Sequence, residues 1–357
     1  PGEIPAHLAK LGYETILVIG KIAFTGDLPW SRTYEIPFIE QRDTALMLFR
    51  QLARKVVFTN ALLFKILVYE KPDIILTQFI PVPQMLAIAA YKLYSKLFRG
   101  HKVRLVAKLD TDGSFARKGL NFVKLYHAIF SNVFDKITVE TPCAYKRITQ
   151  SSMLALLSRK LNIAPDGVPD NIMSHDVTIR RERRILFVGR LIYRKGVDVL
   201  LRALARLKIS GILKGWKVTI VEAYSDPSFA SLLTKYVKLY GLEDAVEFEN
   251  NPPKDELLKL YASSCIYVLP TRQESFGIAL VEALAMGLKV ITTDATCKRF
   301  FEQMGAKIVP VDDVDSLAKA LKEDIEVCNH ANEADLTTSR LARTFLSWDS
   351  IVKTFLT

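Results

Sequence analysis

Residues 185–207, ILFVGRLIYRKGVDVLLRALARL, decide the fold class. Four apolar residues predict a buried strand, and a glycine follows directly at position 189. Apolar residues then recur at positions 197, 200, 201, 204 and 207, which is the spacing of one helix face. A buried strand that turns at a glycine into an amphipathic helix is the repeating unit of a wound parallel sheet.

The same alternation continues in both directions along the chain. Further strands are expected at residues 15–19, 73–79, 103–109, 136–140, 217–221, 245–248, 265–269, 289–292 and 307–309. Strands that alternate with helices predict an α/β protein with two doubly wound, Rossmann-like domains that face each other across a cleft. The turn-rich sequence PDGVP at 165–169 and the polar stretch that follows it separate the two halves. The expected division is an N-terminal domain at 1–168, a linker at 169–184, a C-terminal domain at 185–345 and a last helix at 346–357 that returns toward the first domain.

Composition excludes several classes of protein. The chain has 357 residues, half of them hydrophobic, which excludes a disordered chain and suits two domains of roughly 100–200 residues. Its four cysteines form no close pair, so the usual zinc spacings are excluded and a reducing cytosol is favoured. No run reaches ~18 apolar residues, and therefore we expect no membrane span.

The net charge of +11 lies mostly in the first half. Residues 1–170 contain 23 basic and 14 acidic residues, whereas the remainder has 26 and 24. A one-sided basic field favours an anionic partner, although added solubility also explains it. No nucleic-acid recognition motif is present, so we expect no nucleic-acid partner. Segments 42–55 and 91–104 mix cations with apolar residues, which is typical of helices packed on a sheet and also of helices that lie on an anionic membrane.

Two segments contain the candidate site residues. Arg190 lies at the end of the strand at 185–188, just after Gly189, and Lys195 lies just before the next helix, where free backbone amides and the helix dipole favour an anion. This pair predicts a diphosphate site, the alternative being two exposed cations on a loop.

The second segment is ESFGIALVEALAMG at 274–287. Glu282 is the one polar residue between Ile278 and Met286, and an ionised carboxylate in an apolar helix needs partners. Those partners are protein donors in one interpretation and ligand hydroxyls in the other. With Glu274 on the preceding loop, the segment suits a phosphorylated, polyhydroxylated ligand such as a nucleotide sugar.

These segments resemble the retaining, nucleotide-sugar-dependent glycosyltransferases of family 4, which have the GT-B fold. Residues 189–196 match the GRL…KG turn of that family, and residues 274–287 match its E-x7-E pattern. The resemblance is strongest over about 162–350, and it includes 162–169 (the family's IPNGVD), 255–261 (ee-l-ly) and Ser347-Trp348 (fSW).

The resemblance implies roles for individual residues. Arg190 and Lys195 would contact the donor diphosphate, Glu282 the ribose, and Glu274 the donor sugar. The implied donor-binding set is Gly189, Arg190, Lys195, Glu274, Ser275, Phe276, Gly277, Ile278 and Glu282, and the implied catalytic set is Glu274, Arg190, Lys195 and Asp110.

The chain also departs from the family pattern. It opens at Pro1-Gly2-Glu3, where the family has a glycine loop after a first strand, so that strand is expected to precede this numbering. Asp110 or Asp112 stands where the family often has a histidine near the acceptor, the alternative being turn-forming aspartates. The residues EAYS at 222–225 replace a glycine-rich turn, and His7 is expected to be a surface histidine.

The expected function is therefore a retaining hexosyltransferase that uses a UDP- or GDP-sugar and no cofactor. No Asp-x-Asp motif stands at the donor strand ends, so no metal is expected. The acceptor is expected to be a glycan, a lipid or a lipid-linked sugar at the cytoplasmic face of a membrane, with the basic half on the anionic surface. The alternatives are a soluble acceptor, a nucleotide-sugar epimerase of the same architecture and an inactive sugar-binding module.

Overall fold

The computed structural model describes residues 3–19, 31–35, 49–78, 84–116, 131–177, 180–330 and 333–356. The chain divides into two compact units. Unit 1 contains residues 1–165 and 348–357, and unit 2 contains residues 166–347. None of the described helices is both long enough and apolar enough to cross a membrane.

Unit 2 is a Rossmann-like domain. Its strands are β7 (Glu182–Leu191), β8 (Lys217–Ser225), β9 (Val246–Asn250), β10 (Ser264–Leu269), β11 (Lys289–Thr293) and β12 (Lys307–Val309). Its helices are α6 (Asp170–Met173), α7 (Val197–Ile209), α8 (Pro227–Leu239), α9 (Lys254–Ser263), α10 (Ile278–Ala285), α11 (Lys298–Gln303), α12 (Val314–His330) and α13 (Leu336–Phe345). The strands form one parallel sheet in the order β12-β11-β10-β7-β8-β9.

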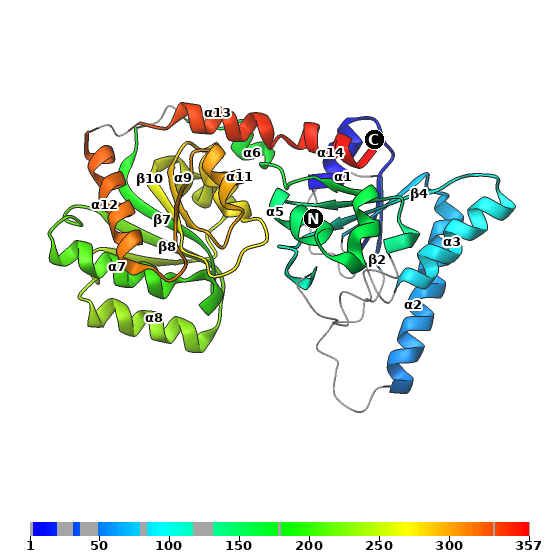
Figure 1. The fold of residues 1–357 in the computed structure, drawn as a ribbon, viewed down its shortest axis with the longest axis horizontal. Helices are drawn as coiled ribbons and strands as arrows, with labels where there is room; N and C mark the ends of the chain where they lie inside the picture. The colour runs from blue at the N-terminus through cyan, green and yellow to red at the C-terminus, as the bar shows by residue number, and fades with distance from the viewer. Residues whose placement is uncertain are drawn as a thin grey trace. The chain divides into compact units, whose positions relative to one another are not determined.

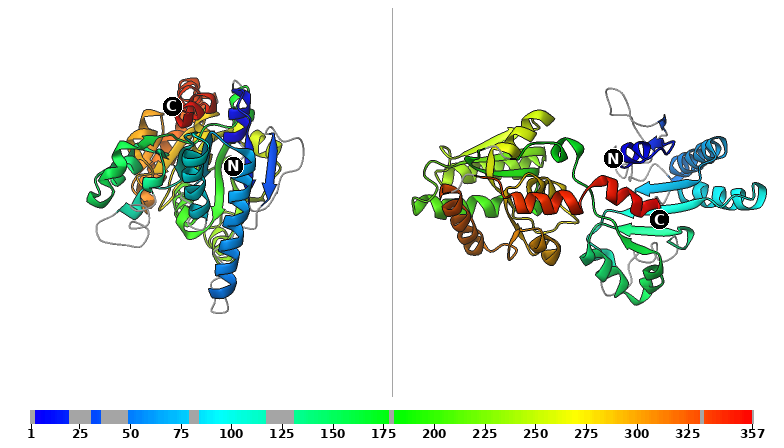
Figure 2. Two further views of the ribbon diagram at one scale, coloured as in Figure 1. Left: turned by 90° about the vertical axis from the view of Figure 1, so that its right-hand side faces the viewer. Right: turned by 90° about the horizontal axis from the view of Figure 1, so that it is seen from above.

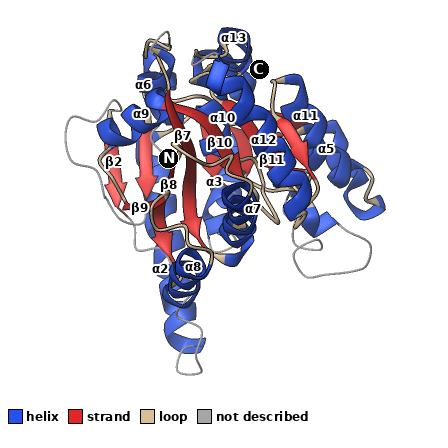
Figure 3. Cartoon of the chain, turned by 90° about the vertical axis from the view of Figure 1, so that its left-hand side faces the viewer, coloured by secondary structure: helices blue, strands red, loops and turns tan. Residues whose placement is uncertain are grey.

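Helices cover this sheet on both faces. Helix α7 packs against α8 and α12, and Figure 3 shows these three helices in front of the strands. Helix α10 packs instead with α6 and α13. All four residues 185–188 of β7 are buried, as the continuous apolar run predicts for a strand covered on both faces.

Capping residues in the sequence explain where several helices begin. The side chain of Asp226 accepts hydrogen bonds from the amides of Ser228 and Phe229, directly before α8. Asp335 does the same for α13 by accepting from the amide of Thr338 at 3.0 Å. Such caps satisfy amides that have no partner within the helix.

Unit 1 is a second parallel α/β assembly. Its described strands are β1 (Ile16–Ile19), β2 (Arg32–Glu35), β3 (Ile74–Gln78), β4 (Arg104–Leu109), β5 (Lys136–Val139) and β6 (Leu161–Ile163). Its described α-helices are α1 (Glu3–Lys10), α2 (Phe49–Glu70), α3 (Met85–Phe98), α5 (Pro142–Thr149) and α14 (Trp348–Leu356). Strands β3-β4-β5-β6 form one parallel sheet in that order, and β1 pairs with β2 in a separate one.

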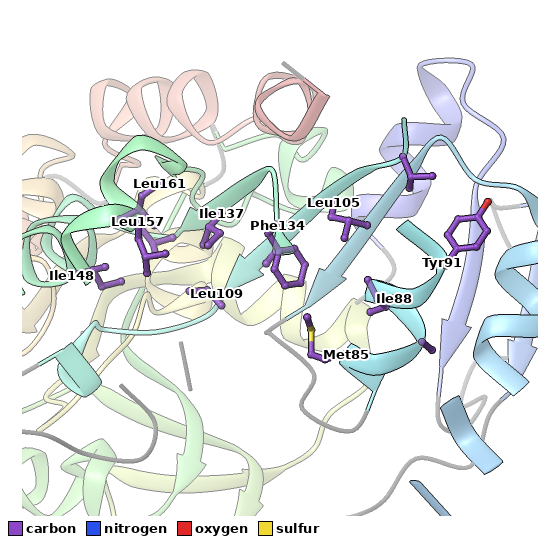
Figure 4. Close-up of a cluster of buried hydrophobic side chains, with 14 of the residues drawn as sticks. Met85, Ile88, Tyr91, Leu105, Leu109, Phe134, Ile137, Ile148, Leu157 and Leu161 are labelled. Carbon is purple, nitrogen blue, oxygen red and sulfur yellow. The ribbon is translucent and has the colours of Figure 1, made fainter. Parts of the chain in front are cut away.

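The core of unit 1 lies on both faces of β4. Leu105, Ala107 and Leu109 pack with residues of α3, β5 and α5 in the cluster of Figure 4. Val106 points to the other face, where it packs with residues of α14. This alternation is the period of a strand, and it gives the sheet an apolar layer on each side.

Helices α1 and α14 lie side by side (Figure 1, Figure 2). The expectation that His7 is a surface residue is wrong, because its side chain is buried between these helices. Its Nδ1 lies 2.8 Å from Oδ1 of Asp349, and its ring stacks on Trp348. The partner residues are more than 300 positions away in sequence, so nothing near His7 in the chain signals its burial.

Candidate functional site

The strand order of unit 2 reverses between β7 and β10. The chain runs from β7 outward through β8 and β9, then crosses back to β10 on the other side of β7. Ligands of wound parallel sheets bind outside the carboxyl ends of the strands at such a switch point. The loops that follow β7 and β10 are the two segments that contain Lys195 and Glu274.

The segment after β7 is held in a tight turn. Gly189 and Arg190 lie near the carboxyl end of β7, and Arg190 is exposed. A short 3-10 helix, Tyr193–Lys195, leads to Gly196, whose φ of 70° is in the left-handed region. Lys195 therefore lies two residues before the start of α7, next to its N-cap residue Gly196 and its first amides.

Replacing Gly196 with alanine is expected to destabilise unit 2 by about 2 kcal/mol, or roughly 4–8 °C in melting temperature. A β-carbon there would stand 1.9 Å from the carbonyl oxygen of Pro270, so the two loops must move apart. Gly211→Ala is the matched control, because Gly211 has the same backbone region (φ 72°) with nothing within 4 Å. Thermal unfolding of both variants measures the effect, and equal losses would contradict the steric argument.

Lys195 and Glu274 meet at the switch point. The Lys195 ammonium forms an ion pair with Oε2 of Glu274, whose other oxygen, Oε1, accepts a hydrogen bond from the amide of Ser275 at 3.2 Å. Both side chains are mostly buried, with 13% and 7% of their surfaces exposed. Phe276 is buried beside Phe301, and it anchors the loop to the body of the unit.

Helix α10 begins directly after this loop. Its N-cap residue is Gly277 with a φ of 96°, and no side chain caps the helix. The first amides of a helix have no partner within it, so those at the start of α10 can bind an anion. Ile278 is half exposed at this end of the helix.

Glu282 has a protein partner that the sequence does not signal. The hydroxyl of Tyr261, at the end of α9, donates a hydrogen bond to Oε2 of Glu282 at 2.8 Å. Burial, followed by the charge of Glu282, raises the pKa of Tyr261 well above its ordinary value. Burial and then the charges of Glu282 and Glu274 do the same to the pKa of Tyr267. The Tyr261 hydroxyl therefore stays protonated, and the hydrogen bond that it donates orients the carboxylate of Glu282.

Arg272 joins the two loops. Its guanidinium forms two hydrogen bonds with the carboxylate of Asp198 in α7, at 2.8 and 2.7 Å, and stacks 3.8 Å above the ring centre of Tyr193. Its backbone amide donates to the carbonyl of Arg194 at 2.7 Å. These contacts, which we call the Arg272 clamp, fix the backbone on both sides of Lys195 relative to the loop that carries Glu274.

Asp110 belongs to unit 1 and directly follows β4. It is ion-paired with the buried Lys108 and accepts a hydrogen bond from Nε2 of Gln78 at 2.8 Å. Asp112 instead closes a turn by accepting from the amide of Ser114 at 2.9 Å. Asp112 is therefore a turn-forming aspartate. Asp110 instead lies in a charged cluster at the carboxyl ends of β3 and β4. In unit 2, residues 222–225 extend β8 to Ser225.

Comparison with known proteins relates this architecture to a family. Residues 173–333 match the family Glycosyl transferases group 1. The MMP alpha-(1->4)-mannosyltransferase of Mycolicibacterium hassiacum is 24% identical over 72% of this chain and 62% of its own length. The D-inositol 3-phosphate glycosyltransferase of Thermobispora bispora is 30% identical over 58% of this chain and 44% of its own. The phosphatidylinositol N-acetylglucosaminyltransferase gpi3 subunit of Schizosaccharomyces pombe is 28% identical over 48% and 36%.

The chain thus spans less than two thirds of the length of these relatives. Among solved structures, a glycosyltransferase from Rickettsia africae superimposes with a TM-score of 0.75 at 15% identity, over 99% of this chain and 91% of that one. Because this superposition covers nearly the whole chain, the similarity in fold includes both units. Unit 2 therefore matches a glycosyltransferase family in sequence, and the chain as a whole resembles the GT-B glycosyltransferases in fold.

Proposed function

We propose that this protein is a retaining hexosyltransferase that moves a sugar from a nucleoside-diphosphate sugar to a glycan, lipid or lipid-linked acceptor. The observation that carries the proposal is the Lys195–Glu274 ion pair beside the start of α10, at the switch point of unit 2. A cation, helix amides and two carboxylates converge there, and these groups match the phosphates and hydroxyls of such a donor.

The proposed chemistry needs a stabilised leaving group. When the bond to the sugar breaks, negative charge develops on the nucleoside diphosphate. Lys195, the exposed Arg190 and the first amides of α10 stabilise that charge without a metal or another cofactor. Glu282, which is oriented by Tyr261, accepts hydrogen bonds from the ribose. The diphosphate replaces Glu274 as the partner of Lys195, and Glu274 then binds the donor sugar.

The acceptor side is proposed to involve Asp110. Its carboxylate, at the carboxyl end of β4 in unit 1, can accept a hydrogen bond from an attacking hydroxyl. The relatives include a D-inositol 3-phosphate glycosyltransferase and a phosphatidylinositol N-acetylglucosaminyltransferase subunit. A soluble phosphorylated polyol is therefore the second candidate acceptor beside a lipid.

Exposed apolar residues on α3 favour a lipid as the acceptor. Leu93, Leu97 and Phe98 are exposed by 58%, 64% and 75%, on the helix whose other side packs into the core. Lys96 and Arg99 lie among them, so this end of the helix combines apolar groups with cations. Such a surface suits the anionic, cytoplasmic face of a membrane. In the other basic segment, 42–48 and the side chains of 49–55 lie outside the described residues.

Donor hydrolysis without an acceptor tests the function. The protein is incubated with UDP-, GDP- and ADP-sugars in EDTA, and the released nucleoside diphosphate and sugar are measured. Slow release from one donor class supports the proposal. An altered nucleotide sugar without release would indicate an epimerase, and a strict requirement for Mg²⁺ would contradict the metal-free site.

Replacing Tyr261 with phenylalanine is expected to weaken binding of the preferred nucleoside diphosphate roughly 3–10-fold. The hydrogen bond that orients Glu282 contributes about 0.5–1.5 kcal/mol, and each 1.4 kcal/mol is tenfold. Tyr267→Phe is the matched control, since its equally buried hydroxyl contacts the carbonyl of Val188 at 3.3 Å instead. Calorimetry should show a change only for Tyr261, and equal Kd values for both variants would make the Tyr261–Glu282 contact merely structural.

Binding of the protein to anionic vesicles is expected to need Lys96 of α3 and Arg99, the C-cap residue of that helix. Each contributes about 1 kcal/mol near an anionic surface, so the variant K96E/R99E should bind phosphatidylserine-containing vesicles at least roughly tenfold more weakly. The control K235E/K238E changes two exposed lysines with the same spacing on α8 of unit 2. Sedimentation of vesicles in low salt measures binding. No binding by the parent protein would favour the soluble acceptor.

A further inference from the structure

A buried lysine lies behind Asp110 in unit 1. Lys108, the second-last residue of β4, has only 2% of its side chain exposed, whereas 20% of the Asp110 side chain is exposed. The Lys108 ammonium forms an ion pair with Oδ1 of Asp110 and lies 3.7 Å from Oε1 of Glu140, whose side chain is 3% exposed. Burial of an ammonium group is very costly unless opposite charges accompany it. The two carboxylates therefore stabilise the buried charge of Lys108.

The register of the parallel strands brings these side chains together. Lys108 pairs with Gln78 of β3 on one side and with Thr138 of β5 on the other. Glu140 directly follows β5, two positions beyond Thr138, and it points to the same face because side chains alternate along an extended chain. Gln78, Lys108 and Glu140 therefore lie at the carboxyl ends of three neighbouring strands. This is the edge at which wound parallel sheets bind their ligands.

The carboxylate of Asp110 is held at both of its oxygens. Oδ1 pairs with Lys108, and Oδ2 accepts a hydrogen bond from Nε2 of Gln78 at 2.8 Å. Two donors from adjacent strands thus fix the rotation of the carboxylate. Each carboxylate oxygen can accept more than one hydrogen bond, so Asp110 can still accept one from a ligand hydroxyl. Lys108 is too deeply buried to contact such a ligand, and it can act on the ligand only through Asp110.

The second carboxylate makes this cation necessary. Oxygens of Asp110 and Glu140 lie within 4.8 Å of each other. Two negative charges at this separation repel each other unless a positive charge offsets the repulsion. Lys108 contacts both carboxylates and supplies that charge. Without it, the more exposed Asp110 would turn away from Glu140 toward solvent.

We propose that Lys108 is a positioning residue for glycosyl transfer, which holds the carboxylate of Asp110 in the orientation that receives the attacking hydroxyl. The inference rests on the proposed function, in which Asp110 accepts a hydrogen bond from that hydroxyl. Lys108 offsets the charge of Glu140 and ties one oxygen of Asp110, while Gln78 ties the other. Lys108 itself touches no substrate.

Donor hydrolysis, in which water takes the place of the acceptor hydroxyl, tests the proposal. Lys108→Met removes the charge and keeps most of the side-chain volume. It should lower kcat about 10–100-fold, as expected when a reacting group is displaced by about 1 Å. KM for the donor should not change, because the proposed donor groups lie in unit 2. The variants D110N and D110N/K108M should be equally slow. Full activity of K108M, or a further loss in the double variant, would overturn the proposal.

A second variant distinguishes lost charge from lost packing. K108M/E140Q removes the carboxylate that repels Asp110, so it should recover much of the rate, and it buries no unpaired charge if K108M fails to fold. A packing defect would not be repaired in this way. Lys136→Met is the matched control, since Lys136 is 8% exposed on the same face at the other end of β5. Absence of recovery in K108M/E140Q, or an equal loss of kcat in K136M, would overturn the proposal.

Crystal structures of the variants separate this inference from the proposed function. The hydrogen bond between Gln78 and Asp110 should be lost in K108M and restored in K108M/E140Q. If it persists in K108M, Lys108 does not position Asp110, whatever the activity. If it is lost while the parent protein hydrolyses none of the donors, the proposed function is wrong and the positioning of Asp110 by Lys108 stands.

Discussion

Replacing Lys195 with alanine is expected to lower kcat/KM for the donor by about 10²–10³-fold, the loss typical when one group that stabilises developing charge is removed. Lys195 stands beside the start of α10, where the departing diphosphate would lie. Lys195→Arg keeps the charge and should recover part of the rate. Steady-state kinetics with the donor found by the hydrolysis assay gives the measurement.

The control for this variant is Lys208→Ala. Lys208 belongs to the same unit and is also ion-paired, with Asp244, but it lies on the solvent side of α7. It should leave kcat/KM unchanged. If K195A lost only stability, and K195A/E274Q recovered it with full activity, the ion pair would be structural and the proposed role of Lys195 would be wrong.

Replacing Arg272 with alanine is expected to destabilise unit 2 by about 1–3 kcal/mol, which lowers the melting temperature by roughly 2–12 °C. Only 11% of the Asp198 side chain is exposed, and the variant removes its two-bond partner and leaves it with Arg202 at 3.2 Å. Asp312 also loses its ion pair with Arg272. Lys208→Ala breaks a more exposed pair and should cost below about 1 kcal/mol.

The double variant R272A/D198A separates two causes of that loss. If the cost comes from the unpaired charge, removing Asp198 as well restores much of the stability. If the double variant is as unstable as R272A, the contacts of Arg272 with Tyr193 and Asp312 are the larger contribution. In either case, loosening the Arg272 clamp should weaken donor binding, because Lys195 and Glu274 are held by the joined loops.

The sequence is sufficient to predict elements with strong apolar patterns. The ten expected strands all overlap observed ones. Continuous apolar runs such as ILFV at 185–188 are stable only when they are buried, so their positions are easy to predict. Strands β2 and β6 are absent from the prediction. RTYE and LNI are short and polar, and tertiary pairing rather than local preference makes them strands.

The sequence predicts where the two candidate loops lie, but it does not reveal the partners of their side chains. The positions of Lys195 and Glu274 follow from where helices start, which local sequence determines. Tyr261 contacts Glu282 across 21 positions of sequence, and Asp198 contacts Arg272 across 74. Only the fold brings these pairs together, and no spacing rule in the sequence reveals them. His7 fails for the same reason.

The packing of α14 against α1 determines the order in which the protein can mature during translation. Residues 348–356 leave the ribosome after all of unit 2, yet they cover the face of unit 1 that holds Val106. Unit 2 is contiguous in the chain and can acquire its whole core while synthesis continues. Unit 1 is synthesised first, but its core is complete only after α14 has been synthesised. Nascent chains stalled before residue 348 should therefore expose that apolar face to chaperones.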